Sequence, residues 1–535
     1  MQKNNNTLYP TLLQSDSVAP PALTDLQPAA TGEGVLDEST FRTMEVDKLF
    51  EALNETSTRI GRSTLYRSLL QPLQSRDDIA AKQDALRELA EHEALRLGLE
   101  QLLAQAAQLE NDFYNLLYGT FLGLTGASAN PLEMGGYGYE SYVKGTRFML
   151  DLVAAAESLP PAQSDYLNNL IADIRGFARS RAYALMQGPV YRSEKTVLTR
   201  AEKRWYIPAV RFSPTMFKPM ALLSTLVGIV LAVQFLPFAL EIASAVTPVF
   251  WLFLLPLSMI YVPIVGSFDR DACIYPLRNI YKSSVELQET MDSLGKLDEL
   301  IGFHRYAQAF KRPLALPEIV ESENHRLELN GVRNPVLAKN NPDYVGNDLI
   351  LTEERLTFVT GPNSGGKTAF CKTLAQTQLL AQIGCYVPAE QAKLSVADRI
   401  FYQVPEISHL SDGEGRFGTE LKRTREIFIA SSAQSLVIMD ELSEGTTHEE
   451  KIEISTDILN GFRQKRCSTL LITHNHELVV YFQQQHIGQA RQAEFSQDHP
   501  TYRMIPGVST VSHADRVAKK VGFSREDIAN LLKGG

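Results

Sequence analysis

The first half of the chain carries apolar residues at the spacing of an α-helix. From Asp77 onward, leucine and isoleucine recur mostly every three to four residues, which predicts one long amphipathic helix with a single buried face. More helix is predicted on both sides of residues 130–145, where Pro131 and a Gly-Gly-Tyr-Gly-Tyr run favour a loop. The apolar positions of the long helix are Ile79, Leu86, Leu89, Leu95, Leu99, Leu102 and Leu109.

Residues 1–35 show no such periodicity. They are rich in Asn, Thr, Ser, Pro and Ala and lack the basic-then-apolar order of a signal peptide. We therefore expect a disordered tail over 1–35 and a helical domain that begins at residue 36 and extends to 218.

The next fifty residues are almost free of charge. Between Lys218 and Asp269 the only charged side chain is Glu241, and each half is long enough to cross a hydrocarbon core of about 30 Å. The pattern predicts a transmembrane helical hairpin over 219–268, with spans at about 220–240 and 248–266 and Glu241 in the turn. The alternative is a hydrophobic hairpin buried in a soluble core or a dimer interface.

Lysine and arginine flank both predicted spans. Five precede the first span and three follow the second, so the positive-inside rule places both termini and the downstream domain in the cytoplasm. The expected location is therefore the membrane, with two spans. The flanking residues are Arg200, Lys203, Arg204, Arg211, Lys218, Arg270, Arg278 and Lys282.

The pattern changes once more in the second half of the chain. Residues 269–328 return to helical spacing, with Leu287, Met291, Leu294 and Ile301 on one face. From about residue 329, short β-rich runs alternate with helical stretches, which is typical of an α/β domain with a largely parallel sheet over 329–535. The clearest strands are 356–360, 436–439 and 469–473.

Composition narrows the class of protein. The 535 residues are 44% hydrophobic and 21% charged, as in ordinary folded domains, and the net charge of −10 has the wrong sign for a chain whose whole surface binds nucleic acid. Four cysteines lie far apart without a CxxC pair, so neither a zinc site nor a disulfide framework is indicated.

A phosphate-binding loop follows the strand at 356–360. The sequence Gly-Pro-Asn-Ser-Gly-Gly-Lys-Thr matches GxxxxGK[ST] between a predicted strand and a predicted helix, which is the context that this motif requires. Backbone N–H groups at the helix start would hold the phosphates, Lys367 would add positive charge, and the Thr368 hydroxyl would bind Mg²⁺. The loop residues expected to contact the nucleotide are Gly361, Pro362, Asn363, Ser364, Gly365, Gly366, Lys367, Thr368 and Ala369.

Two further strands deliver residues suited to hydrolysis. The apolar run 436–439 ends in Asp440, placed to bind the metal directly or through water, and Glu441, placed to orient and deprotonate the attacking water. The strand at 469–473 leads to His474, whose imidazole could donate to the γ-phosphate. A histidine after a strand is by itself more often a structural hydrogen-bonding group, but its place after the loop and the Asp-Glu pair favours a catalytic role.

These blocks together resemble the nucleotidase of the MutS family, which is related to ABC-type ATPases. The resemblance implies an ATP hydrolase with ATP and Mg²⁺ bound, an adenine stacked on Tyr344, a lever domain upstream and a homodimer formed through a C-terminal helix-turn-helix at 506–522. The matching blocks are 360–368, 381–389, 398–401, 439–442 and 473–478, with 333–335 and 344–347 ahead of the loop and 56–62, 69–73 and 82–84 in the lever domain.

The chain departs from the family pattern at three places. Only about 35 residues precede the levers, so the mismatch-recognition and connector domains are expected to be absent, and the uncharged hairpin occupies the position of the DNA-gripping clamp. The family's Ser-Thr-Phe signature is replaced by Gly415, Arg416 and Phe417, with Glu420 retained. We hypothesise that Arg416 acts in trans on the partner's nucleotide, like an arginine finger, and that Gly415 lies at the same trans site.

The expected fold is an α-helical lever domain with a two-helix transmembrane hairpin, followed by an α/β P-loop ATPase domain of the MutS type. The leading functional prediction is a membrane-anchored, dimeric Mg-ATPase that couples ATP binding and hydrolysis to lever movement. The alternative is a DNA-binding mismatch-repair or damage-sensing protein tethered to the membrane. A third possibility is a non-catalytic scaffold that binds ATP as a conformational latch.

Overall fold

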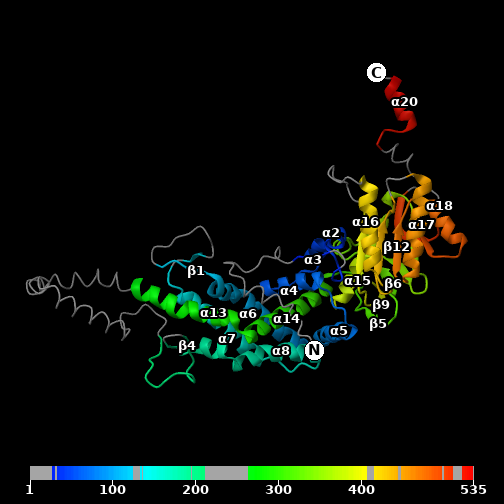
Figure 1. Cartoon of the computed structure of the whole chain (residues 1–535). Coiled ribbons are helices and arrows are strands. Elements are labelled where there is room, and N and C mark those ends of the chain that lie inside the picture. The colour runs from blue at the N-terminus through cyan, green and yellow to red at the C-terminus, as the bar shows by residue number, and fades with distance from the viewer. Residues whose placement is uncertain are drawn as a thin grey trace, which may run out of the picture. The chain divides into compact units, whose positions relative to one another are not determined.

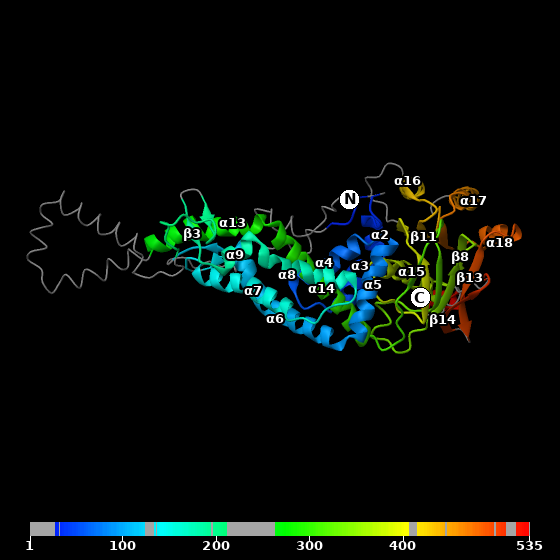
Figure 2. The ribbon, with the colours of Figure 1, turned by 90° about the horizontal axis from the view of Figure 1, so that it is seen from below.

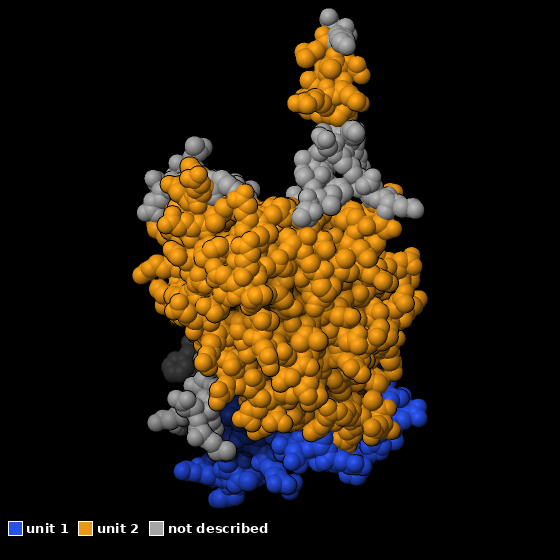
Figure 3. Space-filling view, turned by 90° about the vertical axis from the view of Figure 1, so that its right-hand side faces the viewer, with its two compact units in different colours: residues 1–25, 56–64, 92–299 blue, residues 26–55, 65–91, 300–535 orange. Residues whose placement is uncertain are grey.

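The computed structural model divides the chain into two compact units, coloured separately in Figure 3. Unit 1 comprises Met1–Asp25, Thr56–Thr64 and His92–Glu299, and unit 2 comprises Leu26–Glu55, Leu65–Glu91 and Leu300–Gly535. The boundary falls inside helices α4 (Arg59–Leu70) and α14 (Val285–Ala309). The structure describes residues 27–30, 33–123, 133–134, 136–193, 196–210, 263–405, 415–443, 447–496, 499–509 and 521–533.

Unit 1 is built mainly from helices. Helices α6 (Glu93–Tyr118) and α7 (Tyr139–Glu157) pack side by side (Figures 1 and 2) and bury Leu95, Leu99 and Leu102. The other elements of this unit are β1 (Thr120–Phe121), β2 (Glu133–Met134), α8 (Asp165–Gly176), η2 (Phe177–Arg179), α9 (Arg181–Gln187), β3 (Tyr191–Arg192), β4 (Val197–Leu198), the π-helical turn η3 (Arg270–Ile274) and α13 (Tyr275–Ser283).

The single long helix predicted from Asp77 onward is wrong, because the chain forms two helices there. α5 (Arg76–Glu91) ends before His92, which leaves the helical conformation with φ −99° and ψ 79°, and α6 then begins. Ile79, Leu86 and Leu89 are buried on α5. An unbroken apolar pattern therefore predicted the buried face but not the change of direction.

Two buried carboxylates receive the first backbone N–H groups at the start of α4. Asp298 of α14 accepts hydrogen bonds from the Ser57 N–H at 3.0 Å and from the Thr58 N–H and hydroxyl, both at 2.7 Å. Glu110 of α6 accepts from the Arg59 N–H at 2.8 Å. Since the first N–H groups of a helix have no partner within it, the oxygens of these two side chains satisfy them and connect three helices inside unit 1.

The predicted transmembrane hairpin, and with it the membrane location, is wrong. Within the described ranges, no helix combines the length and the apolar character needed to cross a membrane. Of the predicted spans only 263–266 belongs to the described residues, and it opens a helical stretch that continues through the π-helical turn into α13. Val265 is only 6% exposed, and Asp269, which accepts a hydrogen bond from Tyr139, is 4% exposed. Low charge along a sequence does not distinguish a membrane span from a helix packed against protein. The rest of the predicted hairpin lies outside the described residues, and so do residues 1–26 of the predicted tail.

Unit 2 is organised around a six-stranded sheet in the order β10-β11-β12-β8-β13-β14. The first five strands are parallel and β14 is antiparallel to β13, so the largely parallel sheet predicted from the sequence is confirmed. Figure 2 shows β11, β8 and β13 in that order. The strands are β8 (Leu356–Thr360), β10 (Ile400–Gln403), β11 (Leu436–Asp440), β12 (Ser468–Ile472), β13 (Gln489–Ser496) and β14 (His499–Pro506).

Helices cover both faces of this sheet. On one face α16 (Gly415–Ala430), α17 (His448–Gln464) and α18 (His476–Gln484) enclose an apolar cluster that includes Val437, Met439 and Leu471. The alternate residues Leu436 and Ile438 are also fully buried, and α15 (Lys367–Gln382) contacts β11 and β12. Figure 1 shows these helices around β12. Burial on both faces explains why the strands are uninterrupted apolar runs.

The start of the chain's described part extends unit 2. The Ile400 N–H donates to the Val35 carbonyl at 2.8 Å, which places this segment beside the edge strand β10. Asp37 then caps α2 (Glu38–Thr43) and pairs with Arg423 of α16 at 2.6 Å. The remaining elements of unit 2 are α3 (Val46–Leu53), α5, α20 (Arg525–Lys533) and a four-stranded sheet in the order β5-β9-β6-β7, with β5 (Glu318–Val320), β6 (Leu327–Val332), β7 (Asn347–Leu351) and β9 (Gln391–Ser395).

Candidate nucleotide site

The predicted phosphate-binding loop joins β8 to α15 and depends on glycine. Gly361 and Gly366 adopt φ of 122° and 84°, which side-chain-bearing residues rarely accept, and Gly366 stands directly before α15. A Cβ on Gly365 would lie 2.5 Å from the Ala493 Cβ, and the Gly365 N–H donates to the Pro362 carbonyl at 3.0 Å. The result is a tight turn at a helix N-terminus, where backbone N–H groups and the helix dipole favour an anion.

Lys367 is held inside this turn. Its side chain is 3% exposed, its Nζ donates to the Gly361 carbonyl at 2.7 Å, and the same atom lies 3.5 Å from His474 Nε2. Burial lowers the pKa of Lys367, and the negative charges of Asp440 and Glu441 oppose that shift. A cation in this position is oriented toward the loop and stabilised by the carboxylates at the end of β11.

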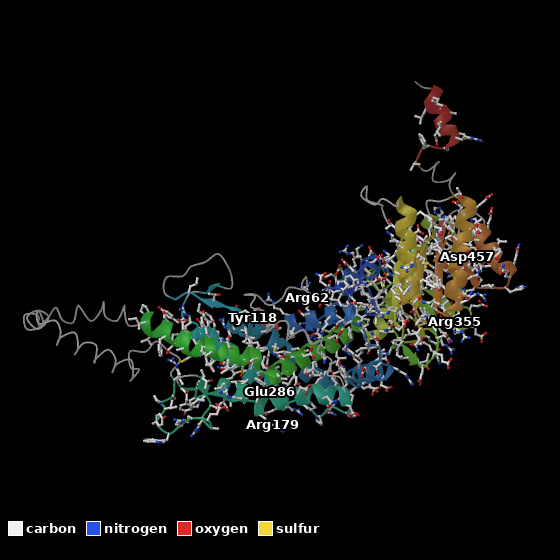
Figure 4. All side chains as sticks on the ribbon, viewed as in Figure 1. Arg62, Tyr118, Arg179, Glu286, Arg355 and Asp457 are labelled. Carbon is white, nitrogen blue, oxygen red and sulfur yellow. The ribbon has the colours of Figure 1, made fainter. Side chains whose placement is uncertain are left out.

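The parallel sheet gathers the other predicted residues at the same edge. β12 lies between β8 and β11, so the loop, Asp440, Glu441 and His474 all follow the carboxyl ends of neighbouring strands. Arg355, labelled in Figure 4, directly precedes β8 and marks the opposite end of that strand. Residues separated by about a hundred positions thus meet at one edge of the sheet.

Thr368 and Asp440 offer a place for a hard cation. The Thr368 hydroxyl donates to Asp440 Oδ2 at 3.1 Å, so a hydroxyl and a carboxylate oxygen adjoin at the loop. Among the described residues no cluster of three or more His, Cys, Asp or Glu side chains could hold a metal. Mg²⁺ commonly takes one or two protein oxygens and completes its shell with phosphate and water, so this pair fits a nucleotide-bound Mg²⁺.

Glu441 lies between the side chains of Lys451 and His474. Its Oε2 is 3.7 Å from Lys451 Nζ and its Oε1 is 3.8 Å from His474 Nε2. The Glu441 side chain is 19% exposed and that of His474 is 42% exposed. The Glu441 carboxylate is therefore largely shielded from bulk water.

A cavity of about 350 Å³ opens beside the loop. Gly366 and Ala369 line it on one side, and Tyr344 belongs to its wall. Burial raises the pKa of Tyr344, while a hydrogen bond with Thr373 opposes the shift. The cavity adjoins the first turn of α15, which is the position expected for the base of a nucleotide whose phosphates occupy the loop.

Tyr502 is another aromatic residue that lines this cavity, beside Tyr344 and Phe370, and it was not predicted from the sequence. Its ring is 3.3 Å from where a Cβ on Gly366 would stand, and the residue is 54% exposed with φ 60°. The Asn347 side-chain amide donates to the Tyr502 carbonyl at 3.0 Å and holds this strained residue in place. No motif marks Tyr502, because its position depends on the pairing of β13 with β14.

The remaining predicted residues are only partly described. Pro362 is buried and Ser364 is exposed, and Asn363 begins a short 3₁₀ turn, Asn363–Gly365. Gly415 is the first residue of α16, but the side chain of Arg416 lies outside the described part of the chain, so the trans role of this pair stays a prediction. Most of the helix-turn-helix at 506–522 is also outside that part.

Comparison with known proteins identifies two matching domain families. MutS domain III matches residues 34–174, and MutS domain V matches residues 357–531. The second match contains the phosphate loop, Asp440, Glu441, His474 and Tyr502.

Individual relatives are similar to part of the chain at moderate identity. A DNA mismatch repair protein MutS of Parabacteroides distasonis is 35% identical over 202 residues, which cover 36% of this chain and 22% of the relative. A MutS of Prochlorococcus marinus is 29% identical over 263 residues, covering 47% of this chain and 29% of the relative. The DNA mismatch repair protein Msh6 of Gallus gallus is 33% identical over 215 residues, covering 38% of this chain and 16% of the relative. The aligned segments thus span less than a third of each of these relatives.

Proposed function

The chain belongs to the MutS family, and from that premise we propose that its unit 2 binds Mg-ATP and hydrolyses it to ADP and phosphate. The observation that carries this proposal is the convergence of the phosphate loop, Asp440, Glu441 and His474 at one edge of a parallel sheet.

Each residue has a role in the proposed reaction that follows from its position. The loop N–H groups and Lys367 bind the phosphates, and Thr368 with Asp440 would hold Mg²⁺, which neutralises phosphate charge when bound. Glu441 orients the attacking water and accepts its proton. His474 donates to an oxygen of the terminal phosphate, where negative charge develops.

The cavity beside the phosphate loop is suited to the base of an adenine nucleotide. Tyr344 and Tyr502 both line the cavity, and aromatic rings stabilise a base by stacking on its face. We therefore assign base binding to these two residues.

Nucleotide binding and steady-state hydrolysis by the full chain and two variants test this proposal. Lys367→Ala should weaken ATP binding and abolish turnover, whereas Glu441→Gln should retain ATP and lose turnover. Release of phosphate at the same rate from the Glu441→Gln variant would refute the assignment of this residue.

Dimerisation and lever movement belong to the same proposal. α20 follows the segment that resembles a dimerising element, and Val521, Phe523, Leu531 and Leu532 expose large apolar surfaces there. Exposed apolar patches of this kind mark protein interaction sites. Helices α4 and α14 contain residues of both units and are the covalent route by which nucleotide binding would move the levers. Sedimentation of the full chain with and without ATP would test the dimer, and a monomer in both conditions would contradict it.

A second candidate function is DNA binding in mismatch repair. It is favoured by the relatives, which are DNA mismatch repair proteins by name. The measurement is affinity for homoduplex, mismatched and branched DNA at several salt concentrations. A steep fall of affinity with salt would support phosphate contacts, and the absence of binding at low salt would exclude this function for the chain.

A further inference from the structure

The turn that carries Glu441 has an unusual backbone. Glu441 and Ser443 adopt φ of 61° and 60°, in the left-handed region that side-chain-bearing residues rarely occupy. Residues held in this region persist only where surrounding contacts impose the conformation. The contacts that hold residues 441–443 therefore decide where the Glu441 carboxylate points.

Several contacts hold this turn. The Glu441 N–H donates to the Ile472 carbonyl of β12 at 2.8 Å, and the Leu442 side chain is 3% exposed within the apolar cluster of the sheet. The Ser443 N–H donates to Glu420 Oε1 at 2.5 Å. The first two contacts belong to the sheet and its core, whereas the third comes from helix α16. A fourth comes from helix α17, where the Ser455 hydroxyl donates to Ser443 Oγ at 3.3 Å.

Glu420 is well placed to act as a rigid acceptor. It is 7% exposed, one turn into α16, and the next turn of the helix is fixed by Thr424, whose hydroxyl donates to the Glu420 carbonyl at 2.9 Å. The Gln403 side-chain amide donates to Thr424 Oγ1 at 3.0 Å, so the helix is attached to β10 at this level. Hydrogen bonds to a charged acceptor are shorter and stronger than those between neutral groups, and burial strengthens them further.

We propose that Glu420 is a positioning residue for hydrolysis, which holds the Ser443 N–H and thereby keeps the Glu441 carboxylate aimed at the phosphate site. This inference rests on the proposed ATPase function. Without the acceptor, the Ser443 N–H loses its partner, and the backbone of this residue can relax from its left-handed conformation although its hydroxyl still contacts Ser455. The phosphate loop and Lys367 belong to β8 and α15 and do not depend on this bond.

The proposal therefore predicts a separation of turnover from binding. Misplacement of a catalytic group by about 1 Å costs on the order of 100-fold in rate. Glu420→Ala should lower kcat by about 10- to 100-fold while the Kd for a non-hydrolysable ATP analogue stays within about twofold, because binding groups are unaffected. Glu420→Gln keeps an acceptor oxygen at the same reach and should restore kcat to within about fivefold of the wild type.

The experiment measures kcat, KM and analogue Kd for the full-length wild type, Glu420→Ala, Glu420→Gln and the control Glu426→Ala. Glu426 lies on the same helix with a side chain that is 50% exposed, so its removal tests general damage to α16. If Glu420→Ala does not fold, Glu420→Asp takes its place, since it keeps the charge but shortens the reach by one methylene.

The outcomes separate this inference from the function on which it rests. A wild type that binds but never hydrolyses ATP would refute the proposed function itself. Hydrolysis by the wild type, combined with equal kcat for Glu420→Ala and Glu426→Ala, would refute the positioning role alone. A parallel loss of analogue binding and turnover in Glu420→Ala would also refute it, because it would show a general structural role.

Discussion

Substitution of Glu110 by glutamine should remove a specific pH dependence from the stability of the protein. Glu110 is 4% exposed, and burial raises its pKa from an ordinary 4.5 to about 7. The nearby charge of Asp298 raises it further, while the backbone N–H groups of Arg59 and Ile60 and the charge of Arg59 oppose the shift. Between pH 4.5 and about pH 7, Glu110 is therefore protonated in the folded chain and ionised in the unfolded chain.

The sign and the size of the effect follow from that difference. Because the folded pKa is raised, the stabilising contribution of protonated Glu110 is complete below pH 4.5 and is lost as the pH rises through about 7. At about 1.4 kcal/mol for each pH unit, the difference amounts to about 3 kcal/mol. Glutamine resembles the protonated acid at every pH, so the variant should be about 3 kcal/mol more stable than the wild type at pH 8 and nearly equal to it at pH 4.

Urea unfolding of the full chain at pH 4, 6 and 8 measures this difference. The control is Glu93→Gln, at an exposed position of the same helix. Since the chain has two units, the transition is followed by hydrogen exchange of amides in α6 as well as by fluorescence. An advantage of Glu110→Gln that is the same at all three pH values would refute the reasoning.

Three further predictions concern unit 2. Tyr502→Ala should weaken ATP binding by about 10-fold or more, because stacking on the base is lost, but leave the affinity for inorganic triphosphate unchanged. Equal losses of affinity for both ligands in a competition assay would contradict the assignment of Tyr502 to base binding. Arg423→Met removes the charged partner of Asp37, whose side chain is only 1% exposed, and should lower the free energy of unfolding by about 3–5 kcal/mol. A loss below about 1 kcal/mol would show that the pair contributes no more than a surface ion pair. Gly365→Ala places a Cβ 2.5 Å from that of Ala493, which distorts the phosphate loop, so calorimetry should detect no ATP binding. Wild-type affinity for ATP would show that the loop does not need this close approach.

The local structure around the candidate nucleotide site could be predicted because each of its parts is encoded in contiguous residues. The glycine-rich loop and the apolar strands before it, before Asp440 and before His474 each define a local structure. Parallel pairing then brings their ends together without further information. The helix face of Leu287, Met291, Leu294 and Ile301 was equally local, and all four residues are fully buried on α14.

Features that depend on distant contacts were not predictable in this way. Tyr502 reaches the cavity through the pairing of β13 with β14, and Glu420 meets Ser443 through the packing of α16. The turn at His92 follows no glycine or proline in the sequence. The membrane prediction failed because it used local composition alone, and a low density of charge is common to lipid-facing and protein-facing helices.

Single-turnover hydrolysis tests the central claim most directly. The full chain is mixed with Mg²⁺ and labelled ATP, with the protein in molar excess over ATP. The amounts of ADP formed and of ATP still bound are measured over time for the wild type and for Glu441→Gln. The account predicts that the wild type converts its bound ATP, whereas the variant retains ATP unconverted. Equal conversion by both proteins, or bound ATP that the wild type never converts, would contradict it.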